Sequence, residues 1–191
     1  MSPFLVSTGV VALSEIGDKT QLLALVLAAR FRAPVPIILG ILIATVANHT
    51  LAGALGTWLT ALLGPQVLRW TVGASFIGMG LWALVPDEDD IDAPRLARYG
   101  VFVTTVIAFF LAEMADKTQF ATMALAARFN ALVPVVAGTT LGMMLADVPA
   151  VLLGDRFAPR LPLSLVRAAS AVLFIALGAL TLLRPYAAFW S

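Results

Sequence analysis

The chain has 191 residues, of which 61% are hydrophobic and only 12% are charged, and its net charge is +1. A soluble domain usually carries about twice that charged fraction, and a mean hydropathy of +0.98 is typical of membrane proteins. The near-neutral charge excludes a long-range attraction to nucleic acid, and the lack of cysteine excludes disulfides, thiolate metal sites and thiol redox chemistry.

Six apolar stretches follow one another along the chain, each long enough for the roughly 20 residues of a membrane-spanning helix. The start of the first stretch has no basic segment and its apolar run is longer than a signal-peptide core, so we interpret it as a span. The predicted fold class is an all-α membrane protein with six transmembrane helices. We expect them over Pro3–Ala29, Pro34–Leu63, Gln66–Val85, Tyr99–Ala127, Leu132–Gly154 and Leu163–Leu183.

The long polar break PDEDDIDAPRLAR, from Pro86 to Arg98, is acidic and rich in proline at its ends. Such a composition is typical of a solvated linker. The break divides the chain into a first three-helix repeat over 1–86, a linker over 87–98 and a second three-helix repeat over 99–191.

The two halves resemble each other at an offset of 98 residues. Glu15–Phe31 aligns with Glu113–Phe129, and ten of these 17 positions are identical. Because each unit has an odd number of spans, the second unit enters the membrane from the opposite side. The sequence therefore predicts an inverted-topology repeat, an arrangement that recurs in secondary transporters. Further matches are Pro36/Pro134, Gly40/Gly138, Gly56/Gly154, Arg69/Arg167, Phe76/Phe174 and Gly80/Gly178.

The basic residues predict the orientation. The side of the membrane that holds the linker carries seven arginines and the other side three. By the positive-inside rule, the linker is cytoplasmic and both termini lie outside. We expect the protein to reside in the cell (inner) membrane. The seven are Arg30, Arg32, Arg95, Arg98, Arg156, Arg160 and Arg167, and the three are Arg69, Arg128 and Arg184.

Charged residues interrupt the first and fourth predicted spans near their middle, where each costs about 2.5–3.5 kcal/mol to insert. On a continuous helix Glu15 and Asp18 share one face, Gln21 continues it, Lys19 lies one turn above Glu15 and Thr20 points away. The fourth span repeats the pattern at Glu113, Asp116, Lys117, Thr118 and Gln119.

Two such faces that meet at a pseudo-twofold axis bring four carboxylates together: Glu15, Asp18, Glu113 and Asp116. Carboxylate, amide and hydroxyl oxygens are the ligands that calcium, magnesium and manganese prefer. The sequence therefore predicts a divalent-cation site at the membrane midplane. Additional ligands or proton-coupling residues are expected among Gln21, Gln119, Thr20, Thr118, Lys19 and Lys117.

Two other interpretations of these charges stay open. In the first, the pairs Glu15–Lys19 and Glu113–Lys117 are i,i+4 ion pairs that only neutralise each other. This interpretation leaves Asp18 and the equivalent aspartate of the second half without a partner. By contrast, the four acids and two lysines together carry a charge of −2, which suits a divalent cation. In the second, the acids relay protons and bind no metal.

The second helices of the two units carry three more polar residues: Asn48, His49 and Asp147. At the 98-residue offset His49 is equivalent to Asp147. A single histidine is more often a packing residue than a ligand, so Asp147 is the better candidate for an additional ligand or a proton-coupling residue.

The paired segments Glu-Ile-Gly-Asp-Lys-Thr-Gln (15–21) and Glu-Met-Ala-Asp-Lys-Thr-Gln (113–119) resemble the E-x-G-D-K-T signatures of a calcium/manganese–proton exchanger family. That family includes Golgi cation exchangers and small bacterial manganese exporters. The resemblance covers nearly the whole chain and implies a six-helix transporter whose ion ligands are Glu15, Asp18, Glu113 and Asp116. Ala115 replaces the second glycine, which puts exact symmetry of the two signatures in doubt.

We therefore expect a secondary transporter that exports Mn²⁺, or Ca²⁺, in exchange for protons. Its predicted partners are the metal ion, protons and the lipid bilayer, without a prosthetic group or nucleic acid; homodimer formation and the role of the lysines stay open. The alternative is a passive divalent-cation channel or uniporter. We do not expect an enzyme, because the chain has neither HExxH nor GxSxG and only one histidine.

Overall fold

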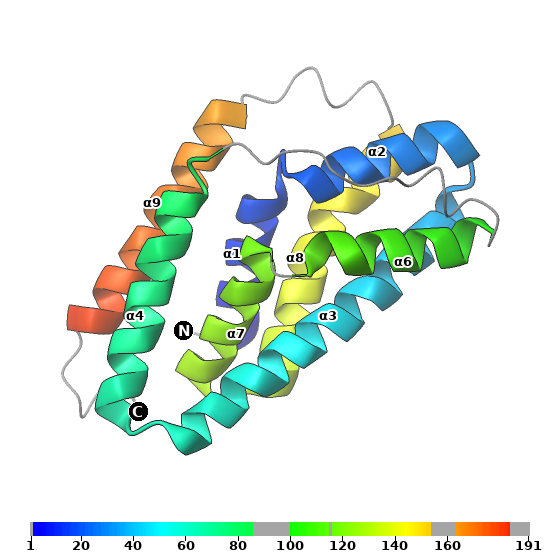
Figure 1. Cartoon of the computed structure of the whole chain (residues 1–191). Coiled ribbons are helices and arrows are strands. Elements are labelled where there is room, and N and C mark those ends of the chain that lie inside the picture. Colours follow the sequence, from blue (N-terminus) through cyan, green and yellow to red (C-terminus); the bar gives the residue numbers. More distant parts are fainter. Residues whose placement is uncertain (1, 86–99, 115, 154–162, 184–191) are drawn as a thin grey trace.

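Helices make up the regular structure of this chain (Figure 1). The computed structural model describes residues 2–85, 100–114, 116–153 and 163–183, and within these ranges it contains eight helices and no strand. The predicted linker at 87–98 and Ala115 lie outside the described residues. The first half holds α1 (Pro3–Glu15), α2 (Lys19–Phe31), α3 (Pro34–Leu62) and α4 (Pro65–Trp82); the second holds α6 (Val101–Glu113), α7 (Lys117–Phe129), α8 (Leu132–Leu153) and α9 (Leu163–Leu183).

The first predicted span is two helices, so the prediction that Glu15, Asp18 and Gln21 share one face of a helix was wrong. Helix α1 ends at Glu15 and α2 begins at Lys19. Between them Gly17 has a φ of 79°, in the left-handed region that residues with a Cβ avoid. Asp18 then caps α2, because its side chain accepts a hydrogen bond from the backbone N–H of Lys19. The glycine and the aspartate together explain the break.

The fourth predicted span is broken at the equivalent place. Helix α6 ends at Glu113, and Asp116 caps α7 by accepting from the backbone N–H of Thr118. Each of these four half-helices has 13 residues. A helix of that length rises about 20 Å, which is less than the roughly 30 Å of a bilayer's hydrocarbon core. In each broken span, one helix therefore ends and the next begins at the membrane depth of the motif.

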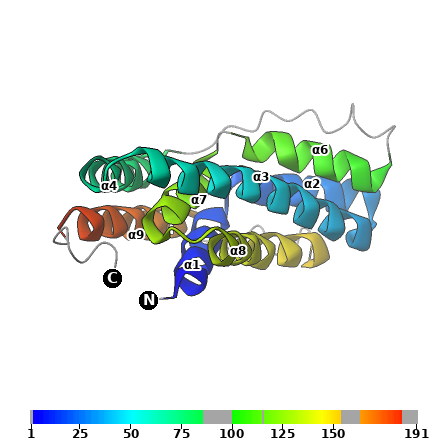
Figure 2. The same cartoon turned by 90° about the horizontal axis from the view of Figure 1, so that it is seen from below.

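Helix packing joins the two halves (Figures 1 and 2). Helices α1 and α2 pack along α8, α6 and α7 pack along α3, and α4 packs against α9. Each broken helix thus lies along the long helix of the other half, and α2 also contacts α6 while α1 contacts α7. This reciprocal packing brings the two breaks to the centre of the protein.

Glycines allow the broken and the long helices to approach closely. A Cβ at Gly138 of α8 would collide with the carbonyl oxygen of Phe4 in α1, and a Cβ at Gly56 of α3 would collide with that of Met123 in α7. Small residues at such crossings are typical of membrane helix pairs, where packing rather than hydrophobic burial holds helices together.

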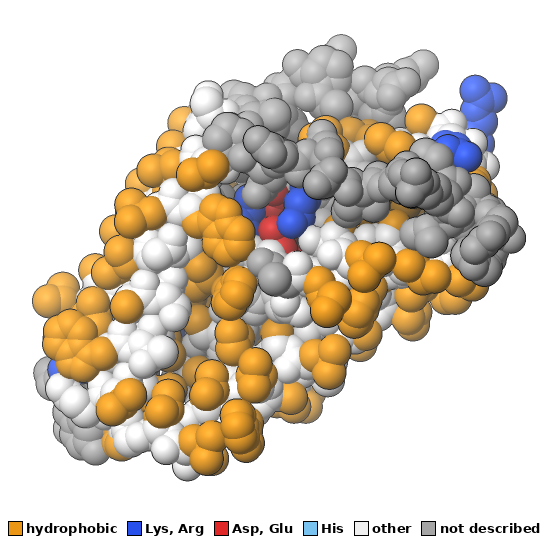
Figure 3. All heavy atoms as spheres, in the orientation of Figure 1, with side chains coloured by type: hydrophobic (Ala, Val, Ile, Leu, Met, Phe, Trp, Pro, Cys, Tyr) orange, Lys and Arg blue, Asp and Glu red, His pale blue; other side chains and the backbone are white. Residues whose placement is uncertain are grey.

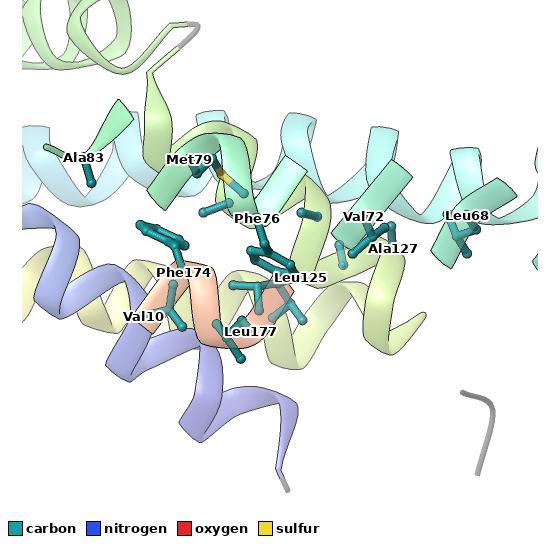
Figure 4. Packing of buried hydrophobic residues seen from close by; sticks show 14 of the residues in the cluster. Val10, Leu68, Val72, Phe76, Met79, Ala83, Leu125, Ala127, Phe174 and Leu177 are labelled. Carbon is teal, nitrogen blue, oxygen red and sulfur yellow. The ribbon is translucent and has the colours of Figure 1, made fainter. Parts of the chain in front are cut away.

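Buried apolar side chains of the packed helices form two clusters. One comes mainly from α4, α7 and α9, and the other from α2, α3, α6 and α8. In the first cluster Phe76 of α4 stacks on Phe174 of α9 with ring centroids 6.4 Å apart (Figure 4). These two residues are equivalent in the two repeats, so the α4–α9 contact follows the internal symmetry of the sequence.

The outer surface carries many large apolar side chains, which appear in orange in Figure 3. Within the described residues, α3 and α8 are long and apolar enough to cross a membrane, and α1 and α6 are shorter apolar helices. Exposed apolar side chains over so many helices are expected of a protein whose solvent is lipid. The fold is therefore that of an all-helical protein with membrane character, and the helices α3, α4, α8 and α9 coincide with four of the six predicted apolar stretches to within a few residues.

Candidate cation site

The four predicted carboxylates lie at the two helix breaks. Glu15 and Glu113 are the last residues of α1 and α6, and Asp18 and Asp116 cap α2 and α7. All four are buried, with at most 2% of the surface of each exposed. Because the breaks meet between the halves, residues about a hundred positions apart in the sequence become neighbours.

Three of these carboxylates form a compact group. One oxygen each of Glu15, Glu113 and Asp116 lies within 4.8 Å of the other two. Two oxygen ligands on opposite sides of a calcium ion are about 4.6–5.2 Å apart, and ligands of manganese or magnesium are closer. The spacing is therefore within the range that one divalent cation can bridge after small movements.

Two ion pairs cross between the motifs. Lys19 Nζ lies 2.8 Å from Asp116 Oδ1, and Lys117 Nζ lies 2.9 Å from Asp18 Oδ1. The alternative in which each lysine pairs with the glutamate four residues earlier was wrong, because the break takes lysine and glutamate off a common helix face. Each lysine instead neutralises the aspartate of the other repeat, so these aspartates are the paired acids.

The motif threonines hold the glutamates. Thr20 Oγ1 donates to Glu15 Oε2 at 2.6 Å, and Thr118 Oγ1 donates to Glu113 Oε2 at 2.9 Å. The prediction that Thr20 points away from the acids was wrong for the same reason as above: α2 runs in a new direction after the break. Among the described residues the other oxygen, Oε1, of each glutamate is buried without a hydrogen-bond partner. A buried acceptor of this kind needs a ligand or a proton.

The motif glutamines connect the breaks to the long helices. Gln21 accepts from the backbone N–H of Gly17 at 2.8 Å and donates to the carbonyl oxygen of Ala146 in α8 at 2.9 Å. Gln119 donates to Asn48 Oδ1 at 3.5 Å, and Asn48 donates to the carbonyl oxygen of Phe110 near the end of α6. In this arrangement the two glutamines and Asn48 link the breaks to the neighbouring helices through hydrogen bonds.

Asp147 and His49 occupy equivalent places in α8 and α3, and both are fully buried. Within the part of the chain that the structure describes, neither the Asp147 oxygens nor the His49 nitrogens have a hydrogen-bond partner. Asp147 is close enough to Glu15 and Glu113 for electrostatic repulsion, although it lies outside the group of three carboxylates. His49 is not brought into that group either.

Sequence reasoning missed Ser170 of α9. Its hydroxyl donates to the carbonyl oxygen of Leu13 at 2.7 Å, and Leu13 is in the last turn of α1, where helical carbonyls lack partners. The equivalent position in the first half is Val72, so the repeat gave no signal for this serine.

A small recess leads from the surface to the break between α1 and α2. Figure 3 shows Asp or Glu side chains at the bottom of a hollow, between Lys or Arg side chains. Ala83 directly follows α4, so the recess lies at the end of α4 that leads into the predicted linker. The recess is lined by Ser14, Ile16, Gly17, Asp18, Ala83, Lys117 and Ser170.

Comparison with known proteins adds the family. The family profile described as divalent cation/proton antiporter GDT1 matches residues 3–91 and 101–188, one segment in each half. A Vibrio cholerae protein whose name gives manganese export as its proposed role is 50% identical over 176 residues, covering 92% of this chain and 88% of that protein.

Two more distant relatives also match over most of the chain. GDT1-like protein 5 of Arabidopsis thaliana is 29% identical over 95% of this chain and 96% of its own length. A GDT1-like protein of Synechocystis is 30% identical over 86% of this chain and 88% of its own length. No solved structure matches the chain.

Proposed function

Because this chain belongs to the GDT1 family of divalent cation/proton antiporters, we propose that it exports Mn²⁺ across the cell membrane in exchange for protons. The manganese assignment is supported by the proposed role of the Vibrio cholerae relative, which is 50% identical. Calcium is the second candidate, since the same oxygen ligands suit both ions. The observation that carries the proposal is the buried group of Glu15, Glu113 and Asp116 oxygens within 4.8 Å of one another.

In the proposed topology the chain crosses the membrane six times. The pair α1 and α2 forms one span broken at its middle, α6 and α7 form another, and α3, α4, α8 and α9 each form one. Three spans per unit make the repeat inverted, with the termini outside and the linker cytoplasmic. The separate family match in each half and the reciprocal packing of the halves support this arrangement.

The electrostatics of the breaks favour a cation. Glu15 and Glu113 stand at the C-terminal ends of α1 and α6, where the helix dipoles are negative. In inverted-repeat transporters such broken-helix ends are the places where coupling ions bind. We propose that Glu15 Oε1 and Glu113 Oε1 bind the ion together with Asp116, while the two threonines keep the opposite glutamate oxygens in place.

Proton exchange follows from the short distances between these carboxylates. Carboxylates a few ångströms apart in a dry pocket cannot all remain ionised without a cation among them. When the metal leaves, at least one of them takes up a proton, and the next metal displaces it. The protein then alternates between a metal-loaded and a protonated form, as antiport requires.

A passive channel or uniporter is the alternative. A channel needs a continuous polar pathway, whereas the buried polar groups described above gather around the two breaks and the recess reaches them from the end of α4. In the proposed orientation that recess opens toward the cytoplasm, so metal enters there before export. Transport of this kind involves no covalent chemistry, and we assign the chain no catalytic role.

Uptake into proteoliposomes tests the choice of ion. Purified protein is reconstituted, and entry of Mn²⁺, Ca²⁺ and Mg²⁺ is measured in parallel, each with and without a pH gradient. The proposal predicts that Mn²⁺ moves fastest and that the pH gradient accelerates it. Equal entry of all three ions, unaffected by pH, favours the channel.

A further inference from the structure

The two crossed ion pairs have the same chemistry but different surroundings. Asp116 contributes to the group of three carboxylates, together with Glu15 and Glu113, whereas among the described residues Asp18 contributes no oxygen to that group. The lysine that pairs with Asp116, Lys19, therefore stands beside the proposed cation position. Lys117, which pairs with Asp18, is bound to an acid outside the group.

Lys19 and a cation compete for Asp116. Lys19 Nζ lies 2.8 Å from Asp116 Oδ1, and the other oxygen, Oδ2, accepts from the Thr118 hydroxyl at 3.3 Å. An ion bound to either Asp116 oxygen lies within a few ångströms of the ammonium group, and the two positive charges repel each other in a low-dielectric pocket. Metal binding at Asp116 therefore weakens this ion pair.

Lys19 is the more exposed of the two lysines. The Lys19 side chain is 23% exposed and the Lys117 side chain 6% exposed. A lysine has a flexible stem of four carbons that can carry its ammonium group to water. Lys19 can turn outward and become hydrated. Lys117 lines the small recess beside Asp18, but both side chains of this pair are almost fully buried, so separating them would leave two buried charges apart, which is costly.

We propose that Lys19 occupies the place of the transported cation when the site is empty, and that an incoming divalent cation displaces it from Asp116, while the Lys117–Asp18 pair stays intact as a fixed link between the halves. This inference rests on the proposed function. It also gives a reason for divalent selectivity: a competitor must attract the carboxylates more strongly than an ammonium ion does, which favours two charges over one.

The inference can be tested by chemical labelling of lysine, because Lys19 and Lys117 are the only lysines of the chain. The full-length protein in detergent is given a short pulse of an amine-acetylating reagent, with and without saturating Mn²⁺, and each lysine is quantified by mass spectrometry. Mn²⁺ binding is measured by calorimetry on the same preparation. NaCl at matched ionic strength is the control for salt effects.

The inference predicts that Mn²⁺ raises the acetylation rate of Lys19 several-fold, that Lys117 does not change, and that NaCl has no effect. It also predicts that Lys19→Met binds Mn²⁺ more tightly than the wild type. If Mn²⁺ binds but Lys19 acetylation is unchanged or slower, or if both lysines react faster together, the inference is wrong and the proposed function stands. If the wild type binds no Mn²⁺, both the proposed function and this inference are wrong.

Discussion

Lys19 in the first half of the chain forms an ion pair with Asp116 in the second half, with 2.8 Å between Nζ and Oδ1. The equivalent residues of the repeat, Lys117 and Asp18, form the second ion pair. Both lysines stand at the first position of the helix that follows a break, Lys19 in α2 and Lys117 in α7. The crossed pairs therefore tie the two repeats together at the place where the cation is proposed to bind.

The first prediction concerns the more buried of these pairs. Lys117→Met leaves Asp18 as a buried negative charge that has lost its lysine, and breaking a buried pair costs about 3–5 kcal/mol. We expect a clearly lower melting temperature in detergent, and the double variant Lys117→Met/Asp18→Asn to recover most of the loss, since its acid is neutral. A double variant no more stable than the single one would show that the ion pair is not the source of the effect.

The second prediction concerns the threonine that holds a glutamate. Thr20→Val removes the hydrogen bond to Glu15 Oε2, and a buried acceptor left without a donor costs about 1–3 kcal/mol. We expect weaker Mn²⁺ binding by calorimetry, because Glu15 is no longer fixed in place. Thr122→Val is the matched control: its hydroxyl bonds only to its own helix, at the Thr118 carbonyl, so it should bind Mn²⁺ like the wild type. Equal loss in both variants would assign the effect to general packing.

Asp147 carries the third prediction. Asp147→Asn replaces a fully buried carboxyl group near Glu15 and Glu113 with an amide, which cannot become ionised when a cation binds, so Mn²⁺ should bind less tightly. Thr140→Val, which removes another buried polar atom of α8 without a hydrogen-bond partner among the described residues, should not alter binding. Unchanged affinity in Asp147→Asn would exclude this aspartate from the site.

The fourth prediction concerns topology. Accessibility tags at the two termini should report the same side of the membrane, and a tag inserted between Asp87 and Asp92 should report the other side. The reason is that each repeat crosses three times. A linker tag on the same side as both termini would contradict the inverted repeat.

Much of the fold could be predicted from the sequence. The 98-residue repeat shows which segments are equivalent, and the equivalent Phe76 and Phe174 do meet in the core. The apolar stretches locate α3, α4, α8 and α9 because a long apolar run leaves few alternatives to a helix. Charged side chains in an apolar stretch are rare, so the sequence could propose the residues of the candidate site. Of the four proposed carboxylates, the structure groups Glu15, Glu113 and Asp116, while among the described residues Asp18 is not part of that group.

The arrangement of the site was less predictable. Assigning Glu15 and Asp18 to one helix face assumed a period of 3.6 residues through the motif, and Gly17 at a φ of 79° breaks that period. Once the helix is broken, the partners of Lys19 and Thr20 depend on how the halves pack. The role of Ser170, which bonds to the end of α1, depends on tertiary contact alone and has no local signature.

Coupling of the two flows is the central claim, and sealed vesicles measure it most directly. A pH-sensitive dye is trapped inside, the membrane potential is clamped, and an outward-directed Mn²⁺ gradient is imposed. The account predicts that Mn²⁺ efflux drives protons inward, and that Glu15→Gln or Glu113→Gln stops both flows together. Because metal and protons compete for the same carboxylates, Mn²⁺ affinity should also fall as the pH is lowered. Mn²⁺ flux without linked proton movement would contradict antiport and leave a uniporter or channel as the mechanism.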